Sequence, residues 1–148
     1  MKKIGDYTIR GQMNVENVFN KIQLFDGRFD TGYKVISFEI APYDTKTASN
    51  DVTAKLCTDD SALADGALWN WQDNREIAWA SCEVRVSFGP SFSSSIVDPD
   101  NLIIEDLYIS YGHVSTDSPV NYLVKLEKYD ISEWQGALSM VRNSSQDV

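Results

Sequence analysis

Hydrophobic and polar residues alternate with a period of two along most of the chain, which is the pattern of half-buried β-strands. Turn residues interrupt the alternation at Asp26-Gly27, at Pro42 and at Gly89-Pro90. The alternating runs are 18–25, 33–40, 52–57, 76–88, 102–111 and 120–129. Short strands separated by turns predict an all-β fold, either an antiparallel β-sandwich or a jelly-roll-like domain.

The C-terminal segment departs from this pattern, because its apolar residues recur at spacings of three and four. These residues are Ile131, Trp134, Ala137, Leu138 and Val141. They predict one short helix over residues 131–142, which Asp130 or Ser132 would cap. Gly136 in its middle disfavours a helix by about 1 kcal/mol relative to alanine, so a final strand remains the alternative. The polar residues 143–148 are expected to form a loose tail.

Composition and charge narrow the class of protein. The chain has 148 residues, of which 43% are hydrophobic, and it contains four Trp, seven Tyr and six Phe. It is therefore predicted to form a single β domain, residues 1–148, with a core that needs no metal or disulfide. Thirteen basic and 22 acidic residues give a net charge of −9. This charge argues against nucleic acid and anionic membranes as partners.

The sequence also limits compartment and cysteine chemistry. Gly5, Asp6 and Arg10 interrupt the apolar stretch that a signal peptide needs, so no signal peptide is predicted. The apolar runs are too short to span a bilayer. Cys57 and Cys82 are expected to be buried thiols, and a disulfide between them would require their strands to be neighbours.

The sequence contains no catalytic or metal-binding motif. Its single histidine, His113, lacks the partners of a zinc site, and there is no serine elbow or glycine-rich phosphate loop. Adjacent strand residues point to opposite faces, so the acidic pairs are expected to be solvated turn residues rather than acid–base pairs. These pairs are Asp59-Asp60, Asp98 with Asp100, and Glu105-Asp106. We expect a protein that is not an enzyme and has no cofactor and no metal; carboxylates that converge in the fold and a loop calcium site remain the alternatives.

Residues 59–74 are predicted to form an irregular excursion that carries an unusual pair of tryptophans. Trp69 and Trp71 are separated by one residue and surrounded by polar side chains, so at least one indole is expected to face solvent. With Asn70 and Asp73 they form a candidate surface for a protein partner or a sugar, because exposed aromatic rings serve both purposes. Core packing is the competing interpretation, and it is favoured for Trp79 on the following strand.

Three stretches resemble small all-β proteins of marine viruses and tailed bacteriophages: IQLFDGRFDTGYKVISFEIAP, NLIIEDLYISYG and VKLEKYDISEWQGALSMVRN. The resemblance covers most of the chain and implies a virion protein assembled in the host cytoplasm, such as a capsid decoration (cement) protein or a tail component. It assigns no catalytic or binding residue. Independently, the excess of aromatic residues suggests an exposed apolar patch. We therefore expect a non-enzymatic structural or assembly protein that forms a homo-oligomer and binds other virion proteins. The alternative is a carbohydrate-binding β-sandwich that uses its loop tryptophans.

Overall fold

The computed structural model describes residues 1–45, 49–85, 92–113 and 119–145. Within these ranges the elements are β1 (Lys2–Met13), β2 (Asn20–Ile22), β3 (Thr31–Pro42), β4 (Asn50–Cys57), β5 (Glu76–Val84), β6 (Phe92–Val97), β7 (Leu107–His113), β8 (Val120–Asp130) and α1 (Glu133–Asn143). The strands form a three-stranded sheet in the order β1-β8-β3 and a five-stranded sheet in the order β2-β7-β4-β5-β6. Their pairings are all antiparallel, so the predicted all-β sandwich with a short C-terminal helix is confirmed.

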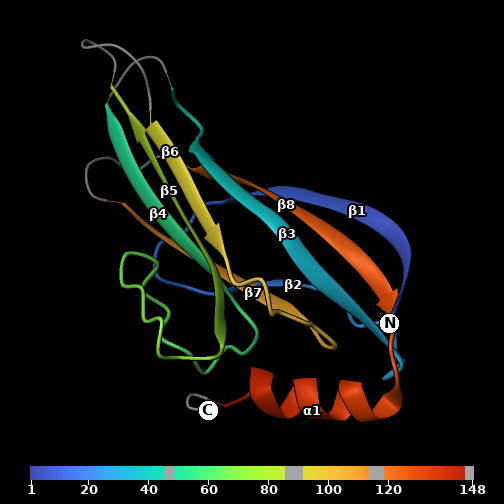
Figure 1. The fold of residues 1–148 in the computed structure, drawn as a ribbon. Coiled ribbons are helices and arrows are strands. Elements are labelled where there is room, and N and C mark those ends of the chain that lie inside the picture. Colours follow the sequence, from blue (N-terminus) through green and yellow to red (C-terminus); the bar gives the residue numbers. More distant parts are fainter. Residues whose placement is uncertain (46–48, 86–91, 114–118, 146–148) are drawn as a thin grey trace.

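The core lies between the two sheets. β3 packs across β5 and β6, and Figure 1 shows these strands side by side where the sheets meet. Phe38, Leu56, Ile109 and Val124 are fully buried members of this core. Alternating burial follows from the two-residue period, because one face of each central strand meets the opposite sheet.

A β-bulge corrects the predicted register of β3. The alternation in the sequence places Ile36 on the same face as Phe38 and Ile40. In the structure the pairing with β8 shifts between Val35 and Ser37, so Val35 turns into the core and Ile36 is exposed. An extra residue in one strand reverses the faces on either side of it.

Several predicted boundaries also change. The run 102–111 forms a strand only from Leu107, and Ile103 makes an isolated bridge to Tyr33. The run 18–25 is reduced to the short β2, and residues 86–88 of the run 76–88 lie outside the described residues. β1 and β6 were not predicted; both are edge strands, and β6 exposes side chains on both faces.

The C-terminal segment forms the predicted helix rather than a final strand. Ser132 caps α1 with a capping box, in which its hydroxyl accepts from the Gln135 N–H and the Gln135 side chain accepts from the Ser132 N–H. α1 ends at Asn143, which is buried, while residues 146–148 of the predicted tail lie outside the described residues. Figure 1 shows α1 lying across one end of the sandwich.

The two cysteines are free, buried thiols on neighbouring strands. Cys82 of β5 pairs with Val52 of β4, whereas Cys57 pairs with Glu76. Val52 and Cys57 are five positions apart, which is about 17 Å along a strand, and a disulfide requires Cα atoms within about 7 Å. Burial raises the pKa of both thiols.

Candidate functional site

Residues 58–75 connect β4 to β5 and pack on the outer face of the five-stranded sheet; we call them the tryptophan loop. Close contact begins at Gly66, where a Cβ atom would lie 2.4 Å from the Tyr111 Cα atom of β7. Only glycine fits against the backbone at this distance. The tryptophan loop therefore lies directly against the backbone of β7, and Figure 1 shows it in green beside the lower ends of β4 and β5.

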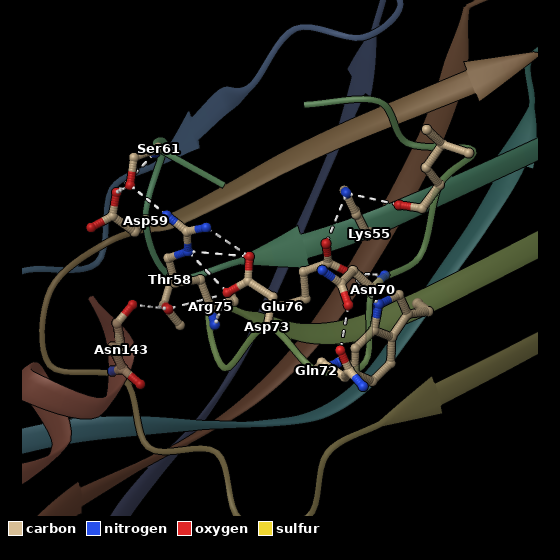
Figure 2. Close-up of polar contacts among 12 residues, drawn as sticks. Lys55, Thr58, Asp59, Ser61, Asn70, Gln72, Asp73, Arg75, Glu76 and Asn143 are labelled. Atoms are coloured by element: carbon tan, nitrogen blue, oxygen red, sulfur yellow. Dashed lines mark hydrogen bonds and ion pairs between the residues drawn. The ribbon is translucent and has the colours of Figure 1, made fainter. Parts of the chain in front are cut away.

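A fully buried ion pair anchors the tryptophan loop. Lys55 Nζ donates to Glu76 Oε2 at 3.0 Å and to the Leu68 carbonyl at 2.9 Å. Glu76 Oε1 accepts from the Asn70 N–H and from the Trp79 indole N–H, both at 2.9 Å. Figure 2 shows Lys55 of β4, Glu76 of β5 and Asn70 of the loop converging at this ion pair. Since both charges are buried and bonded, the pair positions the loop and is closed to a ligand.

A second set of bonds holds the base of the tryptophan loop. Arg75 forms an ion pair with Asp73 at 2.8 Å and also donates to the Ser61 hydroxyl. Burial opposes ionisation of Asp73, but the hydrogen bonds from Arg75 outweigh it and lower the pKa of this carboxyl. The Thr58 hydroxyl donates to the Asn143 carbonyl at 2.6 Å, which ties the loop to the end of α1 (Figure 2).

The structure separates the four candidate site residues. The Trp71 side chain is 65% exposed and Asn70 is exposed beside it, whereas Asp73 is buried in its ion pair. Trp69 is half-buried, and its indole N–H has no partner among the described residues. Trp79 is buried, as predicted, but beneath the tryptophan loop on the face of β5 that carries the ion pair, and its ring centroid lies 5.7 Å from that of Trp71. One tryptophan and one amide therefore remain at the surface.

The outer face of α1 is a second surface, which sequence reasoning did not identify. Trp134, Leu138 and Val141 are 72%, 52% and 68% exposed. Their spacing is that of one helix face, and such a stripe normally packs against a core. Here Gly136 lies against the fold instead, where a Cβ atom would stand 2.3 Å from the Phe29 carbonyl oxygen. We call the three side chains the α1 apolar face.

Polar contacts fix the inward side of α1. Arg142 donates to the Asp100 carbonyl at 2.8 Å and forms an ion pair with Asp98 at 3.0 Å. Asn143 Nδ2 donates to the Leu102 carbonyl at 2.8 Å. α1 is thus docked through glycine and polar groups, which leaves its large apolar side chains toward solvent.

The described residues contain no cluster of three or more metal-ligating side chains. A shallow groove of about 630 Å³ crosses β1, β8 and β3, and Arg10, Gln12, Asn121 and a single carboxylate, Glu39, are among its lining residues. Acid–base catalysis between two carboxylates has no candidate pair in this groove. Among the described residues no helix has the length and apolar character needed to cross a membrane.

Comparisons with protein-family models, with curated proteins and with solved structures gave no match to this chain.

Proposed function

We propose that this chain is a non-enzymatic virion structural or assembly protein, either a capsid decoration protein or a tail component. It acts through self-association and through contacts with other virion proteins. The α1 apolar face is the single observation that carries the proposal. Three large apolar side chains held outward on a docked helix gain free energy when a partner removes them from water.

The chemistry of this surface defines the partner. Glu133 lies in the first turn of α1, next to Trp134 in the sequence, and the whole chain carries a net charge of −9. The partner that fits has an apolar patch bordered by lysine or arginine, because like charges at the rim would oppose association. A basic protein surface of a shell or tail has these properties.

Purified virions test the proposal directly. An antibody raised against the chain should label intact particles in electron micrographs, and the chain should bind particles from which it has been removed. The variant Leu138→Ser should bind such particles at least about ten-fold more weakly, since its apolar side chain is lost from the contact. Virions that contain none of the chain would contradict the proposal.

Carbohydrate binding is the second candidate function, and Trp71 is the observation that favours it. The exposed indole rests on Trp79, and Asn70 and Gln72 are exposed beside it. A fixed aromatic ring flanked by amides can stack on the apolar face of a sugar and bond its hydroxyls.

A glycan screen tests this alternative. If it is correct, a bound glycan quenches tryptophan fluorescence, and Trp71→Ala removes the binding while the fold is retained. Trp134→Ala is the matched control, because it removes an exposed tryptophan from a different surface. Absence of binding to any glycan, or equal loss in both variants, would exclude a sugar site at Trp71.

A further inference from the structure

β1 is the open edge of the three-stranded sheet. Its hydrogen-bonded neighbour is β8, and no other described strand borders it. From Gly5 to Met13 its pairing with β8 is regular, and the single register shift lies earlier, between Lys3 and Gly5. A regular ladder on one side of a strand leaves a regular row of N–H and C=O groups on the other side. Figure 1 shows β1 at the outer margin of the molecule.

Little protects this edge from pairing with another strand. Charged lysines, prolines and bulges are the usual protection. Lys2, Lys3 and the bulge lie at the start of β1, and residues 5–13 contain neither a bulge nor a proline. Tyr7, in the middle of the strand, is 48% exposed. The segment that starts at Gly5 is therefore an available template for a partner strand.

The sequence of this segment is complementary to itself in the antiparallel direction. Residues 5–11 read Gly-Asp-Tyr-Thr-Ile-Arg-Gly. If Thr8 lies opposite Thr8 of a second copy, Asp6 faces Arg10 and Tyr7 faces Ile9, each of them twice. Opposite charges, aromatic with β-branched residues, and paired threonines are the cross-strand combinations that stabilise antiparallel sheets. A two-fold axis requires such self-complementarity, whereas an unrelated partner strand does not.

The side chains are free to make these pairs. Asp6, Thr8 and Arg10 are exposed on one face of β1, since alternate residues share a face. Arg10 forms no side-chain hydrogen bond or ion pair with any described residue. Asp6 contacts Lys3 at 2.8 Å, but Lys3 has a second carboxylate partner in Glu127 at 2.7 Å. Pairing with a second copy therefore disrupts no buried contact.

We propose that β1 pairs antiparallel with β1 of a second copy of this chain, about a two-fold axis at Thr8. The two three-stranded sheets then form one continuous six-stranded sheet. Ile9, which packs at the margin of the core, lies beside Tyr7 of the other copy and extends the apolar layer across the interface. The inference rests on the self-association in the proposed function and assigns it to one strand.

Charge exchange tests both the strand and its register. Arg10→Asp places two carboxylates opposite each other at both ends of the pairing, and Asp6→Arg places two guanidinium groups there. Each variant alone should dimerise at least about ten-fold more weakly than the native chain by sedimentation velocity. A mixture of the two variants should dimerise again, because each copy then presents the charge that the other needs. The double variant Asp6→Arg with Arg10→Asp should dimerise like the native chain.

Glu105→Arg is the matched control, because it makes the same charge change as Asp6→Arg at an exposed position two residues after Ile103, which bridges to β3 at the opposite edge of the three-stranded sheet from β1. Experiments at about 0.15 M salt screen repulsion between whole molecules beyond about 8 Å and leave contact pairs intact. The inference is overturned if the native chain is a monomer at high concentration, or if the two variants dimerise as well alone as mixed. Binding to virions is measured separately, so loss of the β1 inference and loss of the proposed function give different results.

Discussion

Two regions of this molecule differ in whether their polar and apolar groups have partners within the chain or face solvent. Around the tryptophan loop, even a lysine and a glutamate that are fully buried have protein partners. Along β1 and the α1 apolar face, backbone groups and large apolar side chains are left toward solvent. We call these the covered region and the open region. The difference indicates that the buried groups beneath the loop stabilise the fold, while the open region, like the exposed Trp71 on the outside of the loop, is available for recognition.

The two edges of the three-stranded sheet show the same contrast. At the β3 edge, Asn101 Oδ1 accepts from the Val35 N–H at 2.7 Å and Asn101 Nδ2 donates to the Val35 carbonyl. The Tyr33 N–H and carbonyl both bond to Ile103. A short segment thus completes the β3 edge as a strand would, whereas β1 has no such cover among the described residues.

The largest effect on stability is expected in the covered region, at the buried ion pair. Lys55→Met leaves Glu76 charged and buried with two of its donors, and we expect the free energy of unfolding to fall by about 3–5 kcal/mol. Urea denaturation measures this loss. The double variant Lys55→Met with Glu76→Met should recover part of it, because neither charge then remains. If Lys55→Met costs no more than a surface substitution, the pair does not anchor the loop.

The edge cover at β3 should give the next largest effect. Asn101→Ala leaves the Val35 N–H and carbonyl buried without partners, which we expect to cost about 2–3 kcal/mol in urea denaturation. Asn101→Asp keeps the acceptor but places a buried carboxylate oxygen against the Val35 and Asp98 carbonyls, so its cost at neutral pH should be at least as large as that of Asn101→Ala. Equal stability of Asn101→Ala and the native chain would show that the β3 edge needs no cover.

Asp26 is intermediate between the covered and the open region, because its carboxylate is partly exposed but also accepts several hydrogen bonds. Burial opposes its ionisation, but hydrogen bonds from Lys128, the Arg28 N–H and Thr31 outweigh it and lower its pKa to about 2. A carboxyl whose pKa is lower in the folded state stabilises the fold above its unfolded pKa, near 4, and this contribution is lost as the pH falls toward 2.

The native chain should therefore be more stable than Asp26→Asn at pH 6 by about 1 kcal/mol, a value reduced by the solvation of the pair. The difference should shrink between about pH 4 and pH 2. Thermal unfolding at a series of pH values measures it, and a difference that does not change with pH would contradict the role of the ionised carboxylate.

Substitutions on the α1 apolar face are expected to have the smallest effect on stability. They are expected to have the largest effect on binding to a partner. Leu138→Ser should change the free energy of unfolding by less than about 0.5–1 kcal/mol, since its side chain is half-exposed and packs little. Gly136→Ala is the contrasting variant on the same helix. Its added methyl group has no space against Phe29, so it should destabilise the docked helix by about 1–3 kcal/mol although alanine favours helices. A large loss in Leu138→Ser would mean that this face is structural.

The sequence predicted the covered parts of the fold better than the open parts, for a physical reason. A strand such as β8 buries mainly one face, and burial of one face produces the two-residue alternation. β6 exposes most side chains on both faces, so its sequence carries no such alternation. β1 does alternate from Asp6 to Met13, so this strand could have been predicted from the sequence. The helix was predictable from Ser132 and the apolar spacing, but spacing does not reveal which face docks. The close contact between Gly136 and Phe29 determines which face of α1 docks against the fold.

The sequence predicted that the tryptophan loop would expose an aromatic side chain, but it did not predict which side chains of the loop turn inward. Closely spaced tryptophans in a polar loop indicated that one indole would face solvent, and Trp71 does. That Asp73 turns inward depends on its pairing with Arg75, and the anchor of the loop joins Lys55 to Glu76 across two strands. Local sequence patterns do not encode such contacts. The self-complementarity of residues 5–11 is visible in the sequence, but only the strand order shows that β1 is an edge strand that can pair with a second copy.

Amide hydrogen exchange as a function of protein concentration tests the contrast between covered and open regions most directly. If β1 pairs with a second copy, amides in residues 5–11 that face the open edge become protected as the concentration rises. Amides of β4 and β5 beneath the tryptophan loop stay equally protected throughout, because their partners lie within one chain. Exchange in β1 that is independent of concentration, up to the highest attainable, would contradict recognition through the open edge.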